Sequence, residues 1–275
     1  MAPAQAAPEV EIAWHADQPA WAKADDHPVE AHAAGLRLRV PGIAAFDVQP
    51  AQIDVFPAAD AEERSVRTYL YGSAIGALLH VRGLTVLHGS TVRLPDGTAA
   101  VICGHSTAGK STLAAALAMR GMPLLADDVT AVQLDAQGQA WCLPGLARTK
   151  LWRTALDRLG LSTRASEATR LMPTLDKHVI ALDTWPEPAP VRHLVELDAS
   201  GSVLGMRPIR GMDRLTVLMA QVYRPGYLHA MQQEARLLRQ AAAIAPQLQM
   251  LRVVRPRDGD TPQPIIDGLL REWGL

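Results

Sequence analysis

The sequence predicts an α/β fold in which short apolar strands alternate with amphipathic helices, preceded by a small β-rich lobe. Three observations predict it. A strand pattern, a Gly-rich loop, a helix pattern and a further strand follow one another between Ala99 and Ala126. Upstream, apolar and polar residues alternate in short runs, as they do in half-buried strands. Downstream, helix and strand patterns continue as far as Trp273.

The beginning of the chain is expected to form a small lobe of β-strands. Residues before Pro28 show no clean periodicity, whereas Gly35–Val40 alternates apolar and polar side chains. The expected strands are Gly35–Val40, Ala45–Val48 and Gln52–Phe56. We therefore expect two domains, a β-rich lobe over residues 1–62 and an α/β domain over residues 63–275.

A helix and two strands are expected next. From Glu62 to Arg82 apolar residues recur at three-to-four spacing, which is typical of an amphipathic helix, and Gly83 ends it. The apolar runs Leu84–Leu94 and Ala99–Cys103 then flank a turn at Asp96-Gly97. The later elements are expected as helices at 112–120, 151–159, 213–220, 227–244 and 264–273, and as strands at 122–126, 191–197 and 250–254, with 167–176 irregular.

Length and composition indicate a globular protein with a sizeable core. Of the 275 residues, 48% are hydrophobic and 20% charged, which fits one large domain or one domain with a small appendage. The formal net charge of -1 lacks the basic excess of nucleic-acid binders, so no nucleic-acid partner is expected. Cys103 and Cys142 lie outside any C-x-x-C or His-rich context and are expected to be reduced and buried.

No targeting or membrane segment is expected. Met1–Val10 has no basic start followed by an apolar run. No stretch of the chain approaches the roughly 20 apolar residues that a membrane helix needs. We therefore expect a cytoplasmic protein without a membrane partner.

The Gly-rich loop carries the strongest functional signal in the sequence. Gly104-His105-Ser106-Thr107-Ala108-Gly109-Lys110-Ser111 matches G-x-x-x-x-G-K-[ST] and lies between an expected strand and an expected helix. Inward-turned N–H groups and the helix N-terminus favour phosphate, Lys110 reaches the β- and γ-phosphates, and the Ser111 hydroxyl can ligate Mg²⁺. The alternative is a Gly-containing turn that binds nothing. The predicted ATP-binding residues are Gly104, Ser106, Thr107, Ala108, Gly109, Lys110, Ser111 and Thr112.

Two adjacent carboxylates end the next expected strand. One of Asp127 and Asp128 can hold Mg²⁺ while the other accepts the proton of an attacking hydroxyl. The residues by themselves leave open which of the two takes which role. The alternative is a solvated turn. His88 precedes Gly89 on the strand before the loop, and a catalytic and a structural role are equally open for it.

Further cationic residues are weaker candidates. Arg148, Lys150 and Lys177 could neutralise a transferring phosphate, although a solvated surface position is the more common one for such residues. Arg210 and Arg214 flank an expected helix start and could reach a phosphate or an acidic tail of a substrate.

These motifs together resemble a known family. His88-Gly89, the Gly104 loop, Arg120-Gly121 and Leu125-Ala126-Asp127-Asp128 resemble, in the same order, the catalytic domain of HPr kinase/phosphorylase. The resemblance is strongest over residues 84–132. Weaker likeness, over Tyr69–Leu84 and in the stretch Pro144–Trp152, is to short HPr-kinase-like proteins of peptide-modification gene sets, including lasso-peptide kinases.

The resemblance implies a P-loop kinase core of the HPr kinase catalytic-domain type that uses ATP and Mg²⁺. It implies that Lys110 and Ser111 serve phosphate and metal, that Asp127 and Asp128 supply metal binding and base, and that His88 lies near the attacking hydroxyl. The sequence departs from the family pattern in two ways. Thr107 replaces a Gly in the loop, and no counterpart of the family's phosphorolysis signature is found, which puts phosphorylase activity in doubt.

The expected function is transfer of the γ-phosphoryl group of ATP to a hydroxyl, with Asp128 as the base and Asp127 and Ser111 on the metal. The expected acceptor is a serine of a lasso-precursor-like peptide or of a small protein. Two alternatives remain open, a kinase for a small-molecule alcohol and a regulatory nucleotide-binding NTPase. The guanine-selective Asn-Lys-x-Asp motif is not found, which favours transfer over switching. An oligomer is possible, and acceptor choice is expected to lie in the lobe and in Leu161–Asp176.

Overall fold

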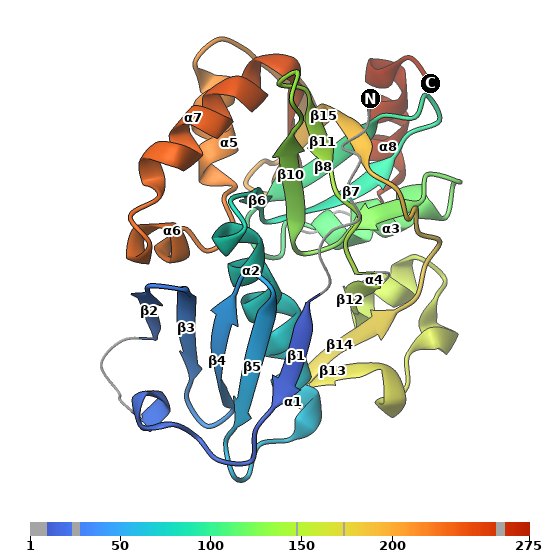
Figure 1. The fold of residues 1–275 in the computed structure, drawn as a ribbon. Coiled ribbons are helices and arrows are strands. Elements are labelled where there is room, and N and C mark those ends of the chain that lie inside the picture. Colours follow the sequence, from blue (N-terminus) through green and yellow to red (C-terminus); the bar gives the residue numbers. More distant parts are fainter. Residues whose placement is uncertain (1–9, 24–27, 147, 173, 257–261) are drawn as a thin grey trace.

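A computed structural model describes residues 10–23, 28–146, 148–172, 174–256 and 262–275 (Figure 1). The expectation of no leader concerns Met1–Val10, and of these residues only Val10 is among those described. Ala147, within the stretch Pro144–Trp152, also lies outside the described residues. Three sheets with flanking helices make up the described part, and this confirms the predicted α/β class. Short 3₁₀ turns occur at Ala20–Lys23, Ser162–Arg164, Glu167–Thr169 and Ala245–Gln247.

The N-terminal lobe is a five-stranded sheet, drawn in blue in Figure 1. Its strands, in spatial order, are β1 (Glu11–Trp14), β5 (Gln52–Pro57), β4 (Ala44–Gln49), β3 (Gly35–Val40) and β2 (Val29–His32). The three inner strands lie where the sequence predicts them. The two edge strands were not predicted, because they bury almost no side chain and so show no apolar alternation.

The predicted helix over Glu62–Arg82 is present and contains one irregular turn. It consists of α1 (Glu63–Tyr69), a π-helical turn at Leu70–Ala74 and α2 (Ile75–Val81). Its apolar face packs against the N-terminal sheet in one core cluster that includes Phe46. This cluster contains residues from both sides of the expected domain boundary between residues 62 and 63. The division into two domains therefore stays a prediction.

A nine-stranded sheet forms the centre of the described α/β part. It runs in the order β6 (Thr85–Leu87), β10 (Thr130–Leu134), β11 (Ala140–Cys142), β15 (Ala189–Asp198), β8 (Ala99–Gly104), β7 (Gly89–Arg93) and β9 (Leu124–Ala126), with β17 (Gln249–Val254) beside β15 and β16 (Gly205–Ile209) beside β17. The long apolar run Leu84–Leu94 is two strands, β6 and β7, because the chain leaves the ladder at His88.

Helices cover both faces of this sheet. Helices α3 (Lys110–Ala118) and α8 (Gln263–Trp273) share one core cluster with Ile102 and Val253. Helices α5 (Asp213–Ala220) and α7 (Glu234–Ile244) share another with Val101 and Cys103 on the opposite face. Cys103 and Cys142 are buried free cysteines, as predicted, and burial raises the pKa of each thiol to about 12.

Three predicted elements need correction. The helix expected at Tyr227–Ile244 is broken into α6 (Gly226–Ala230) and α7, because Gln232 takes a left-handed φ of 56°. The segment expected to be irregular contains β13 (Arg170–Met172) and the start of β14 (Leu175–Ile180), which form a small sheet with β12 (Thr149–Trp152). The helix expected at 151–159 is α4 (Arg153–Arg158), since its first residues belong to β12.

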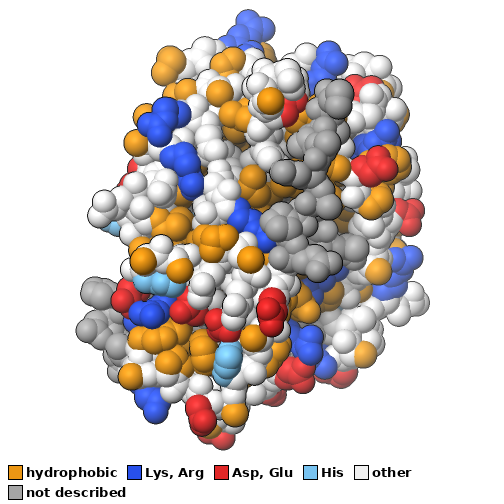
Figure 2. Space-filling view, viewed as in Figure 1, with side chains coloured by type: hydrophobic (Ala, Val, Ile, Leu, Met, Phe, Trp, Pro, Cys, Tyr) orange, Lys and Arg blue, Asp and Glu red, His pale blue; other side chains and the backbone are white. Residues whose placement is uncertain are grey.

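The remaining global expectations concern membranes and surface charge. The longest helices, α7 and α8, have 11 residues each, and no helix within the described ranges could cross a bilayer. On the face drawn in Figure 2, positive and negative side chains are interspersed among apolar ones.

Candidate active site

The Gly-rich loop joins β8 to α3, as the sequence predicts. Left-handed backbone occurs at Gly104 (φ 140°), Thr107 (φ 67°) and Gly109 (φ 98°). A Cβ on Gly104 would lie 2.4 Å from the carbonyl oxygen of Leu197 on β15, so only glycine fits the end of β8. Thr107, the departure from the family pattern, takes a conformation that is costly for a β-branched residue.

Lys110 lies within the loop that it follows in sequence. Its Nζ donates hydrogen bonds to the carbonyl oxygens of Gly104, at 2.9 Å, and of His105, at 3.1 Å. Burial lowers the pKa of this ammonium, and the neighbouring Asp127 and Asp128 act in the opposite direction. The side chain is therefore a buried cation at the position where the loop would cradle phosphate.

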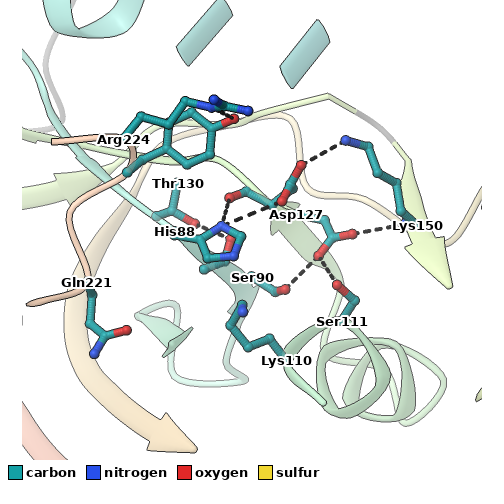
Figure 3. A network of polar contacts seen from close by, with 12 residues as sticks. His88, Ser90, Lys110, Ser111, Asp127, Thr130, Lys150, Gln221 and Arg224 are labelled. Atoms are coloured by element: carbon teal, nitrogen blue, oxygen red, sulfur yellow. Dashed lines mark hydrogen bonds and ion pairs between the residues drawn. The ribbon is translucent and has the colours of Figure 1, made fainter. Parts of the chain in front are cut away.

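Asp127 directly follows β9 and is held by four donors, of which Ser90, Ser111 and Lys150 are labelled in Figure 3. Its Oδ1 accepts from the hydroxyls of Ser90, at 2.5 Å, and Ser111, at 2.8 Å. Its Oδ2 accepts from the Thr149 hydroxyl, at 2.6 Å, and from the backbone N–H of Lys150, at 3.0 Å. The two residues predicted to bind metal are thus in direct contact, and their rotamers are fixed by neighbours.

The hydroxyl of Ser111 and the carboxylate of Asp127 fit Mg²⁺, which prefers oxygen donors. Among the described residues, no group of three His, Cys, Asp or Glu side chains could hold a metal by itself. A magnesium ion held by Ser111 and Asp127 would therefore take its other ligands from phosphate and water, which is the usual mode for this ion.

Asp128 has a left-handed backbone, with φ 73°, and the partners of its carboxylate differ from those of Asp127. Its Oδ2 pairs with Lys150 Nζ at 2.7 Å, and its Oδ1 lies 3.5 Å from His88 Nδ1. Burial alone would raise the pKa of Asp128, but Lys150, His88 and Lys177 together hold it below its ordinary value. Asp128 is therefore an ionised carboxylate at neutral pH, and it lines the large cavity that also contains the loop.

His88 lies between β6 and β7 and lines the same cavity. Its Nδ1 donates to the carbonyl oxygen of Asp128 at 3.1 Å, which leaves Nε2 as an acceptor. Burial, followed by the nearby Lys110 charge, lowers the pKa of the imidazole, so the ring is neutral at pH 7. The contact with Asp128 joins two of the predicted catalytic residues directly.

Gln221 links the loop to His88 and was missed in the sequence. Its Oε1 accepts from the backbone N–H of Gly104 at 3.0 Å, and its carbonyl oxygen accepts from the N–H of His88 at 2.7 Å. The residue follows α5, far from both partners along the chain, and no motif surrounds it. Ser90 and Thr149, the supports of Asp127, were also missed, although Ser90 stands two residues after His88.

The weaker cationic candidates separate into two groups. Lys150 pairs with Asp128, and Arg148 and Lys177 interact electrostatically with the same carboxylate. Arg210 and Arg214 instead line a separate cavity of about 200 Å³ next to Trp273. Arg224, which the sequence analysis did not single out, lies beside the site network (Figure 3).

The cavity over the loop has a volume of about 600 Å³, which is within the range of nucleotide and cofactor pockets. Its lining includes the loop and the start of α3 over Ser106–Leu113, together with the polar side chains of His88, Asp128, Lys150 and Lys177. Apolar side chains such as Leu197, Leu204 and Ile265 line it as well. The cavity thus combines the loop, polar and charged side chains and apolar surface.

Comparisons with known proteins give remote structural similarities and no sequence match. No family model matches the chain, and no curated protein matches it. Solved structures do match, among them the structure of the Hpr(Ser) kinase/phosphatase from Coxiella burnetii. The sequences are 12% identical, the alignment covers 68% of this chain and 94% of that chain, and the TM-score is 0.35. At this score the similarity carries no conclusion about activity, so the functional argument rests on the geometry of the site.

Proposed function

We propose that this chain is an ATP-dependent kinase that transfers the γ-phosphoryl group to a hydroxyl, with a serine of a peptide or small protein as acceptor. The observation that carries the proposal is the division between two adjacent carboxylates. Asp127 is hydrogen-bonded to Ser111 at the start of α3, whereas Asp128, whose backbone is left-handed, lines the cavity. One carboxylate is thereby available for metal and the other for the acceptor hydroxyl.

Each group of site residues has its own role in the proposed phosphoryl transfer. The N–H groups of the loop and Lys110 bind the phosphates, and Ser111 and Asp127 hold Mg²⁺. When bound, this ion neutralises charge on the β- and γ-phosphates. The acceptor oxygen forms a bond to the γ-phosphorus, the bond from that phosphorus to the β–γ bridging oxygen breaks, and ADP leaves. The hydroxyl proton passes to the Asp128 carboxylate.

Two neighbours prepare Asp128 for this role. The ion pair with Lys150 keeps the carboxylate ionised despite burial, and the Asp128 carbonyl accepts a hydrogen bond from His88, which fixes the backbone behind it. A loose phosphoryl-transfer transition state places positioning and charge above base strength. A carboxylate with a lowered pKa is therefore sufficient as the proton acceptor.

The finer parts of the proposal rest on the sequence. The likeness to lasso-peptide kinases supports a lasso-precursor-like peptide as acceptor, and the net charge of -1 supports a protein without a nucleic-acid partner. The proposals of a cytoplasmic location and of no membrane partner rest on the expected lack of a targeting or membrane segment. A homo-oligomer is compatible with the proposal, which does not depend on it.

The test is phosphoryl transfer by the wild type and by Asp128→Asn. Each protein is incubated with MgATP and a panel of serine-containing peptides, an HPr-like protein, free serine and other small alcohols, and the acceptors are analysed by mass spectrometry. We expect a phosphate-sized mass gain on a peptide, lost in the variant while ATP still binds. Labelling of a small alcohol alone would favour the small-molecule kinase, and ATP binding without any labelled acceptor would favour a regulatory NTPase.

A further inference from the structure

Positive side chains outnumber carboxylates around the proposed base. Lys150 pairs with Asp128, and Arg148, Lys177 and Arg224 interact electrostatically with the same carboxylate. Lys110 adds a further cation on the loop side. Five cationic side chains therefore interact electrostatically with Asp128. Lys110, Lys150 and Lys177 line the cavity over the loop and are available to phosphate, which leaves the two arginines to be explained.

Arg148 is held as a preorganised donor. Its guanidinium lies 4.3 Å from the ring centroid of Tyr71, which belongs to the π-helical turn. Burial lowers the pKa of Arg148, and its Nη2 is buried without a hydrogen-bond partner among the described residues. A buried, unsatisfied donor on a charged group is costly, and a ligand oxygen at this position would remove the cost.

Arg224 reaches the site from another part of the chain. It follows Tyr223 with a left-handed φ of 44°, and its Nε donates to the Tyr223 hydroxyl at 3.2 Å. The guanidinium also lies 5.9 Å from the ring centroid of Tyr227. Left-handed backbone is uncommon for a long side chain and concentrates at functional sites. The guanidinium is thus held next to two tyrosines, one of which also accepts its hydrogen bond.

The π-helical turn lies between the surroundings of the two arginines. A Cβ on Gly72 would lie 3.8 Å from the Tyr223 hydroxyl and 3.9 Å from Lys150 Nζ. Gly72 adjoins Tyr71, which supports Arg148, while Tyr223 supports Arg224. The helix that packs on the N-terminal sheet therefore also lies next to Tyr223 and Lys150, at the edge of the site.

We propose that Arg148 and Arg224 form a subsite for a carboxylate of the acceptor, next to the hydroxyl that is phosphorylated. The proposal rests on the proposed kinase function and adds the chemical class of its acceptor. A planar guanidinium matches a carboxylate with two parallel hydrogen bonds, whereas Lys150 and Lys177 act as point charges for the transferred phosphoryl group. On a serine-bearing peptide the carboxylate comes from an acidic neighbour or from the chain terminus.

Equilibrium binding of matched peptides in the presence of Mg²⁺ and a non-hydrolysable ATP analogue tests the subsite. One pair is acetyl-Ala-Ser-Glu-Ala amide and its Gln counterpart, and the other is acetyl-Ala-Ala-Ser with a free or an amidated terminus. We expect the wild type to favour the carboxylate member of at least one pair by about tenfold or more, as a charge-assisted hydrogen bond provides. The pair that shows the preference identifies the source of the carboxylate.

The preference should disappear in Arg148→Gln and in Arg224→Gln and persist in Arg239→Gln, an exposed arginine of α7. Arg224 is exposed, so its variant should fold even if that of Arg148 does not. Equal binding within both pairs, no binding of any peptide, or a preference that survives both substitutions would overturn the subsite. Preferred binding of the carboxylate peptide without phosphate transfer would support the subsite and count against the kinase function. Phosphate transfer without such a preference would support the kinase function and count against the subsite.

Discussion

Replacing Gly104 with alanine should destabilise the protein well beyond the cost of a left-handed residue. The added Cβ would lie 2.4 Å from the carbonyl oxygen of Leu197, on a backbone with φ 140°. The conformational strain is about 1–2 kcal/mol, and displacing a packed backbone adds about 1–3 kcal/mol. Alanine also lowers the conformational entropy of the unfolded chain, which stabilises the folded state by about 0.4–1 kcal/mol. We therefore expect the free energy of unfolding to fall by about 2–4 kcal/mol in total.

Gly121→Ala is the matched control, since Gly121 also has a positive φ, of 83°, but has no atom within 4 Å of the added Cβ. Its loss should be about 1 kcal/mol or less, because only conformational strain remains. Urea unfolding of both variants gives the free energies. In Gly104→Ala we also expect weaker ATP binding, because the shifted carbonyl of residue 104 contacts Lys110. Equal losses in the two variants would refute the reasoning.

Three further substitutions test other parts of the site and its surroundings. Asp127→Asn should weaken Mg²⁺-dependent ATP binding by about tenfold or more, measured by titration calorimetry, and an unchanged magnesium dependence would contradict the metal assignment. Thr107→Gly should raise the free energy of unfolding by up to about 1 kcal/mol, because relief of left-handed strain exceeds the added chain entropy; a lower urea midpoint would speak against this. Burial lowers the pKa of His80 from 6.5 to about 4, although its hydrogen bond to the Tyr223 carbonyl opposes the shift. The unfolded chain therefore takes up the proton first, and about 3 kcal/mol of stability should be lost as the pH falls from 6.5 to 4. His80→Gln should flatten that part of the pH–stability curve, and an equally steep curve would be the contrary result.

Local patterns in the sequence determined the loop and its surroundings. The strand β8, the loop and α3 are contiguous, so the spacing of Gly104, Gly109 and Lys110 already places a phosphate cradle at the start of a helix. Asp127 and Asp128 directly follow β9, the next strand along the chain, so their place near the loop could also be predicted from local sequence. Strongly alternating or amphipathic segments, such as Gly35–Val40 and Asp213–Ala220, were predicted with their correct bounds.

Elements with a weak local signal were not predicted, or were predicted wrongly. The edge strands β1 and β2 bury too little to show a pattern, and β16 was also missed. The break between α6 and α7 depends on the backbone of Gln232, a residue type with no strong preference for the left-handed region. Helical periodicity continues across such a break, so it cannot be seen in the sequence.

Only the tertiary structure decided which residues meet at the site. Gln221 contacts Gly104, and Thr149 contacts Asp127, across stretches of chain that no motif spans. The left-handed φ of Asp128 was not predicted, and the sequence alone left the roles of the two aspartates as an assignment. Arg224 comes within electrostatic range of Asp128 from a part of the chain far away in sequence. A motif records neighbours along the chain, whereas a site is made by neighbours in space.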